Sequence, residues 1–98
     1  MVRLVIHAPT LAALARARGN LANLLKAEPN CEVELVVNGE AAVEIVRNPD
    51  LECARHCVVC ENSLRSANLV CPPGLRMAEA AVLHIARRQA EGWGYWRA

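Results

Sequence analysis

The chain has 98 residues, with 11 Lys and Arg against 10 Asp and Glu and a formal net charge of +1. This length suits one domain over residues 1–98. The balanced charge gives no electrostatic reason to expect binding to nucleic acid or to an anionic membrane. No stretch approaches the roughly 20 apolar residues of a membrane span, and the apolar run after Arg3 is too short for a signal peptide. We therefore expect a cytoplasmic protein whose five cysteines stay reduced.

Hydrophobic periodicity predicts strands and helices that alternate along the chain. The predicted strands cover residues 2–7, 31–37, 56–60, 75–78 and 94–96. The predicted helices run from residue 11 to the break at 29–30, over 41–47, over 61–67 and from 82 to about 92, while 51–55 is either helical or irregular. Thr10 is placed to cap the first helix, and Asn38-Gly39 is a turn before the second. Helices that separate consecutive strands predict a mainly parallel sheet in an α/β fold.

Cys60 is the most informative residue, because it lies where the third predicted strand passes into a helix. A thiol there faces the first free N–H groups of the helix, and the helix dipole favours a thiolate. Parallel sheets also bind ligands beside the carboxyl ends of their strands, where His7 ends the first strand. We expect the pKa of Cys60 to lie below that of a free thiol. The alternative is that Cys60 is only a small buried hydrophobe.

The other cysteines suggest three sites that we consider less favoured. Cys53, Cys57 and Cys60 have a C-x3-C-x2-C spacing like that of an iron–sulfur loop, and His56 would complete four zinc ligands. Cys57 and Cys60 also form a C-x-x-C pair, although in redox motifs the first cysteine starts the helix. Residues three apart on a strand point to opposite faces. We therefore expect no metal and no cofactor.

The last predicted helix and the end of the chain carry the remaining polar and aromatic candidates. His84 and Arg87 lie on the last helix, either as part of a solvated polar stripe or within reach of the Cys60 crevice. The aromatic residues are confined to residues 93–96, so the core is aliphatic. Trp and Tyr favour half-buried positions. We therefore expect a homo-oligomer with this segment at or beside a subunit contact.

Four segments together resemble one known family. They are Cys-Glu-Asn-Ser-Leu at 60–64, the ending His-Ile-Ala-Arg-Arg-Gln-Ala-Glu-Gly-Trp-Gly-Tyr at 84–95, Asn-Leu-Ala-Asn-Leu-Leu at 20–25 and Val-Glu-Leu-Val-Val-Asn-Gly at 33–39. In this order they are similar to motifs of the DsrE/DsrF-like sulfur-relay proteins. The resemblance covers nearly the whole chain. The chain lacks the extended partner-binding segments of the better-characterised members, and Cys53, Cys57 and Cys71 have no family counterpart.

The resemblance implies a three-layer α/β/α sandwich with a five-stranded parallel sheet, assembled as a trimer or hexamer. It implies that Cys60 carries persulfide sulfur, with Asn62 and Ser63 as motif neighbours, and that sulfur donor and acceptor proteins are the partners. The expected activity is that of a sulfurtransferase that passes sulfur to an acceptor thiol. Two alternatives stay open: a non-catalytic oligomeric module that binds a ligand or partner, and a redox sensor that pairs Cys60 with Cys57 or Cys71.

Overall fold

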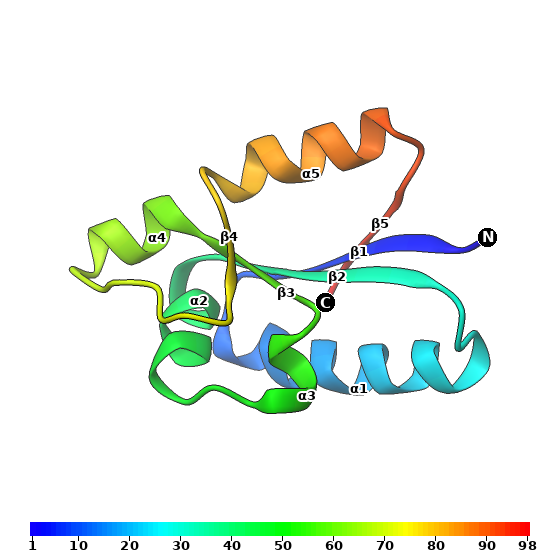
Figure 1. Cartoon of the computed structure of the whole chain (residues 1–98), viewed down its shortest axis with the longest axis horizontal. Helices are drawn as coiled ribbons and strands as arrows, with labels where there is room; N and C mark the ends of the chain where they lie inside the picture. Colours follow the sequence, from blue (N-terminus) through cyan, green and yellow to red (C-terminus); the bar gives the residue numbers. More distant parts are fainter.

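The computed structural model describes all 98 residues and contains one five-stranded sheet. The strands are β1 (Arg3–Ala8), β2 (Glu32–Val37), β3 (Cys57–Cys60), β4 (Arg76–Ala78) and β5 (Gly94–Arg97). The helices are α1 (Leu11–Ala27), α2 (Gly39–Arg47), α3 (Leu51–Ala54), α4 (Glu61–Ser66) and α5 (Ala81–Ala90). The strand order is β4-β3-β2-β1-β5, and every pair is parallel. The predicted α/β/α sandwich is confirmed (Figure 1).

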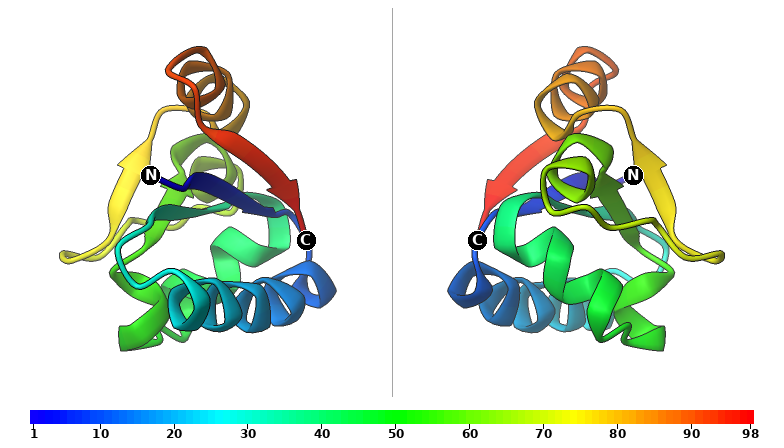
Figure 2. Two further views of the ribbon diagram at one scale, coloured as in Figure 1. Left: turned by 90° about the vertical axis from the view of Figure 1, so that its right-hand side faces the viewer. Right: turned by 90° about the vertical axis from the view of Figure 1, so that its left-hand side faces the viewer.

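The two faces of the sheet are covered unequally. Figure 2 shows α1 and α3 beneath the sheet and α5 above it. The larger core cluster has 16 buried residues and includes apolar side chains of α1 and α2. The cluster under α5 has only six: Val5, Val36, Val58, Cys60, Ala81 and Ile85. Alternate residues of β2 and β3 enter opposite clusters, as the pleat of a strand requires.

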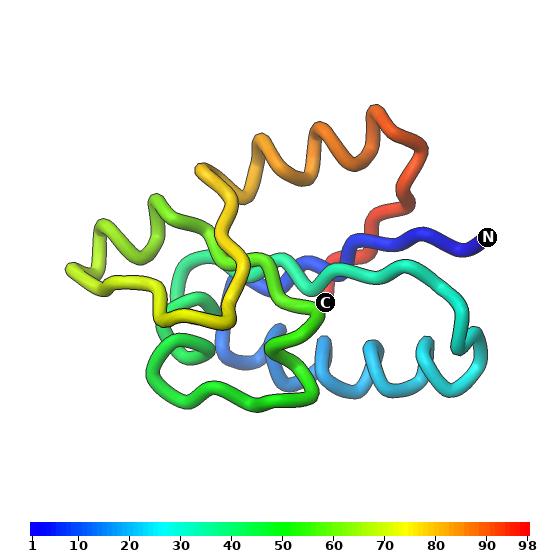
Figure 3. Tube along the Cα trace, in the orientation of Figure 1, coloured from blue at the N-terminus to red at the C-terminus, as the bar shows by residue number.

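The two ends of the chain meet in the sheet. The trace in Figure 3 brings the last strand alongside the first, with Leu4 opposite Gly94 and His7 opposite Arg97. The predicted short strand near the C-terminus is therefore β5, an edge strand. None of the helices combines the length and apolar character that crossing a bilayer requires.

Two local signals position the segments that follow β1 and β2. Thr10 caps α1, because its Oγ accepts the Ala13 N–H at 3.0 Å. Gly39 begins α2 with a φ of +55°, and a Cβ there would lie 2.9 Å from the Pro9 carbonyl oxygen. Only glycine avoids both the strained backbone and the clash. This glycine holds the start of α2 close to the end of β1.

Candidate functional site

Cys60 is the last residue of β3 and the N-cap of α4. Its side chain enters the cluster under α5, and the residue is 5% exposed. The backbone N–H of Ala81, the first residue of α5, donates to the Cys60 Sγ at 3.4 Å. Ala80, the N-cap of α5, makes no side-chain capping bond. The Cys60 sulfur therefore satisfies one of the free N–H groups at the start of α5.

Ser63 links Cys60 to a third helix. The N–H of Gly39, the first residue of α2, donates to the Ser63 Oγ at 2.8 Å. This leaves the Ser63 hydroxyl proton to donate to the Cys60 sulfur. The starts of α4 and α5 thus meet at the Cys60 thiol, and the start of α2 is linked to it through Ser63. N–H and O–H groups are donors of the kind that favour a sulfur anion.

These contacts determine the acidity of the Cys60 thiol. Burial raises the pKa of Cys60, but hydrogen bonds from the Ser63 hydroxyl and from the N–H groups of Ser63, Ala81 and Asn62 lower it. The net pKa is below the ordinary value of 9.0. This is the direction expected from the sequence. Asn62 contributes through its backbone and is itself exposed at the surface.

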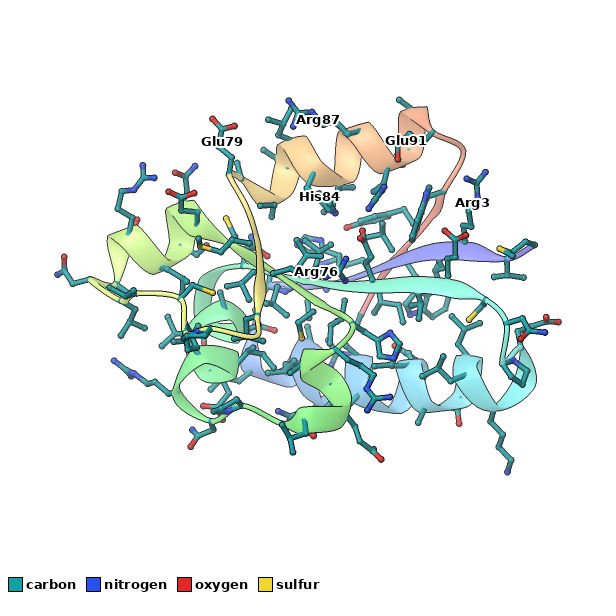
Figure 4. All side chains as sticks on the ribbon, in the orientation of Figure 1. Arg3, Arg76, Glu79, His84, Arg87 and Glu91 are labelled. Atoms are coloured by element: carbon teal, nitrogen blue, oxygen red, sulfur yellow. The ribbon has the colours of Figure 1, made fainter.

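His84 and Arg87 occupy other environments. The His84 Nε2 lies 2.7 Å from the Glu34 Oε1, so its ring is bound to that carboxylate. Figure 4 shows His84 on the side of α5 that faces the sheet and Arg87 on the outer side, where it is exposed. Of the residues expected to surround Cys60, the structure brings Asn62 and Ser63 to the sulfur. It gives His84 a different partner.

Glu34 is the centre of a buried ionic cluster that the sequence did not predict. The residue is 3% exposed, although it lies in the middle of β2. Its carboxylate accepts from Arg88 at 2.8 and 2.9 Å, from Arg76 at 3.2 Å and from the His84 ring. Burial raises the pKa of Glu34, but the bonds from Arg88 and His84 outweigh it and bring the pKa to about 2. A carboxylate paired in this way stays ionised inside the fold.

Three polar side chains meet on the face of the sheet that α5 covers, beside the carboxyl ends of β1 and β2. The His7 Nε2 lies 2.8 Å from the Asn38 Oδ1, and its Nδ1 lies 2.7 Å from the Tyr95 hydroxyl. They border a pocket of about 400 Å3 whose opposite wall is α5. Ala81 belongs both to this wall and to the Cys60 contact. The predicted crevice beside His7 is therefore present.

The remaining cysteines lie away from Cys60. Cys53 and Cys57 are buried in the cluster on the α1 side, and Cys71 packs against that cluster. A hydrogen bond from Cys57 lowers the pKa of Cys53 to about 7, with burial opposing and Arg18 assisting. The same bond and burial raise the pKa of Cys57. Because Cys60 lies across the sheet, neither Cys57 nor Cys71 is placed to form a disulfide with it.

No group of three or more His, Cys, Asp or Glu side chains is arranged to hold a metal ion. Both an iron–sulfur site and a zinc site with this spacing would need Cys53, Cys57 and Cys60 on the same side of the sheet. The structure instead places Cys60 in a different core cluster from the other two. The opposite orientation of Cys57 and Cys60, expected from strand geometry, is confirmed.

No protein-family model matches the chain, and no curated protein matches it. One solved structure, a protein of unknown function from Methanobacterium thermoautotrophicum, is similar over 100% of both chains, with a TM-score of 0.88 and 23% sequence identity. At this identity the likeness establishes the fold alone. The site described above therefore has to be interpreted from its own geometry.

Proposed function

We propose that Cys60 accepts sulfane sulfur as a persulfide and passes it to an acceptor thiol. The observation that carries this proposal is the set of donors around its sulfur: the Ala81 N–H at 3.4 Å and the Ser63 hydroxyl, itself oriented by Gly39. Such donors stabilise a thiolate, which is the nucleophile and also the leaving group in sulfur exchange. The resemblance of residues 60–64 to a sulfur-relay motif supports the same chemistry.

The exchange involves no net oxidation. The Cys60 thiolate attacks the outer sulfur of a donor persulfide, the new S–S bond forms, and the donor S–S bond breaks to release the donor thiolate. In the second step an acceptor thiolate attacks the outer sulfur on Cys60. The acceptor leaves as a persulfide, and the Cys60 thiolate is restored. The donors around Cys60 stabilise the anion before the first step and after the second.

Access to the sulfur depends on the segment that covers it. Cys60 is 5% exposed and lies opposite Ala78 in the β3–β4 pair. β4 is a three-residue edge strand in which Arg76 and Met77 are exposed. Short edge elements with few buried contacts open at low free energy. In this proposal the segment from Ala78 to Ala80 moves aside to admit the donor, while the Ala81 N–H stays on the sulfur.

The proposal includes a homo-oligomer, trimer or hexamer, in the cytoplasm, with sulfur donor and acceptor proteins as partners. Each terminal aromatic has a partner within the chain: Trp93 packs on Arg88, Tyr95 bonds to His7 and Trp96 donates to Asn20. Tyr95 and Trp96 are nevertheless 40% and 53% exposed on an edge strand. Exposed aromatics of this kind are enriched at subunit contacts.

A second candidate function is a non-catalytic module that binds a small ligand. It is favoured by the pocket beside His7, which does not include Cys60 among its lining residues.

The third interpretation, a redox sensor with Cys57 or Cys71, loses its physical basis because both thiols lie on the other side of the sheet.

A transfer assay tests the proposed function. The protein is loaded with inorganic polysulfide, desalted and mixed with a small acceptor thiol, and the sulfane sulfur on protein and acceptor is measured by cyanolysis. We expect Cys60→Ser to abolish transfer and Cys71→Ser to leave it unchanged. Equal transfer by the Cys60→Ser protein would refute the proposal.

A further inference from the structure

The pocket between α5 and the ends of β1 and β2 combines a polar floor with an apolar wall. His7, Asn38 and Tyr95 form the floor, and α5 forms the wall with the apolar Val82, Ile85 and Ala86 and the polar Gln89. A volume of about 400 Å3 lies within the range of small-molecule sites. The pocket also lies where open α/β sheets bind their ligands, outside the carboxyl ends of the strands.

The hydrogen bonds among His7, Asn38 and Tyr95 fix the orientation of these side chains and leave some of their polar groups free to bind a ligand. The Asn38 Oδ1 faces the His7 Nε2 and accepts from it, and in the tautomer with a proton on Nε2 the Nδ1 accepts the Tyr95 O–H. The bond to His7 uses only the oxygen of the Asn38 amide, so its Nδ2 remains a donor. The Tyr95 oxygen retains lone pairs as an acceptor. The floor therefore offers at least one donor and one acceptor, and the Gln89 amide on the wall adds a further polar group.

The lining of the pocket disfavours ionic ligands. None of its side chains is Lys, Arg, Asp or Glu, although 21% of the chain is charged. A charged molecule would lose its hydration there without gaining a counter-ion. Val82, which is 77% exposed at the rim, extends the apolar wall outward. An occupant needs an apolar body and one uncharged polar end.

We infer that this pocket binds an uncharged small molecule with an apolar or aromatic body and an amide-like edge, held by Asn38 and Tyr95. The pocket adjoins the proposed sulfur site at Ala81, but its lining does not include Cys60. Binding is therefore measurable whether or not Cys60 carries sulfur. The aromatic body packs on Val82 and Ala86, while the amide edge pairs with the floor.

The test uses two probes of the same shape, 2-naphthamide and 2-naphthoate, titrated into isotope-labelled full-length protein and followed by NMR. We expect saturable shifts of the Val82, Ala86 and Tyr95 amide signals with naphthamide, in the millimolar range typical of a ligand of this size. The anionic probe should bind about tenfold more weakly or worse because it cannot be neutralised in the pocket.

Two alanines of α5 provide matched variants. Ala86 lines the pocket, whereas Ala90 is exposed on the same helix and does not. Ala86→Leu should fill the pocket and abolish the naphthamide shifts, and Ala90→Leu should leave them unchanged. The inference is overturned if neither probe saturates, if naphthoate binds as well as naphthamide, or if Ala86→Leu binds normally. A drop in the mass of the assembly caused by Ala86→Leu alone would overturn it too, because a second copy of the chain would then occupy the pocket.

Discussion

The Ala81 N–H donates to the Cys60 sulfur across 3.4 Å, so the start of α5 both covers the thiol and stabilises its anion. These two effects change the reactivity of Cys60 in opposite directions. Covering the sulfur slows its reaction with a partner, whereas the N–H donor lowers the pKa of the thiol and so favours the reactive thiolate. The hydroxyl of Ser63 adds a second donor, which Gly39 orients. The sulfur is therefore covered, while the donors around it lower the pKa of the thiol.

Removing the Ser63 hydroxyl should raise the pKa of Cys60, because that hydroxyl is the leading contact that lowers it. In Ser63→Ala, the pH midpoint for alkylation of Cys60 by iodoacetamide should move upward, measured by peptide mapping. Stability should fall by about 1 kcal/mol, since the Gly39 N–H loses its acceptor. Ser66→Ala, an exposed position on the same helix, is the control. An unchanged midpoint in Ser63→Ala would show that the hydroxyl does not act on the thiol.

Replacing Glu34 by Gln should destabilise the protein, because Arg88 and Arg76 lose their buried counter-ion. The drop in the pKa of Glu34 from 4.5 to about 2 corresponds to about 3 kcal/mol. This stability is fully present above about pH 4.5 and is lost as the pH falls towards 2. Chemical denaturation at several pH values measures it, with the exposed Glu32→Gln as control. Equal unfolding free energies for the two variants at pH 7 would contradict the ionic cluster.

Two glycines should respond in opposite directions to substitution by alanine. Gly39→Ala combines a φ of +55° with a Cβ 2.9 Å from the Pro9 carbonyl oxygen, and should cost about 1–3 kcal/mol. Gly19 lies inside α1, and a Cβ added there would meet nothing within 4 Å. Gly19→Ala should therefore stabilise the protein by roughly 0.5–1 kcal/mol. Thermal unfolding of both variants distinguishes the two effects, and a tolerated Gly39→Ala would refute the close approach of β1 and α2.

The fold was predictable because its signals are local. The Val58-Val59-Cys60 run ends where α4 begins, Thr10 caps α1, and Gly39 starts α2. Each of these depends on residues close together in the sequence. The position of Cys60 at a strand end, and the bonds from Asn62 and Ser63, follow from the same local pattern.

The polar clusters were not predictable in this way, because they join residues that are far apart. Glu34 is one of two charged residues in β2, and its partners Arg76 and Arg88 follow 42 and 54 residues later. Tyr95 reaches His7 across 88 residues, because β5 pairs with β1. The sequence left His84 either on a solvated stripe or near Cys60, and its actual partner Glu34 lies 50 residues away. The charge of Glu34 inside a buried strand was the one signal that a partner was needed.

Oligomerisation can be tested at the exposed edge of the sheet. If β5 forms the subunit contact, Trp96→Lys should reduce the assembly towards monomer at micromolar concentration, because it places a charge in the contact. Met77→Lys changes a comparably exposed residue on the opposite edge strand and serves as control. Light scattering measures both. A monomeric wild-type protein would contradict the proposed assembly.

Sulfur loading of Cys60 is tested most directly by peptide mapping with mass spectrometry, after exposure to polysulfide and removal of excess reagent. All five cysteines are free thiols, so each is a potential site. We expect one added sulfur atom on the peptide that contains Cys60, reversed by an acceptor thiol. Sulfur found instead on Cys31, Cys53 or Cys71, with Cys60 unmodified in the folded protein, would contradict the proposed role of Cys60.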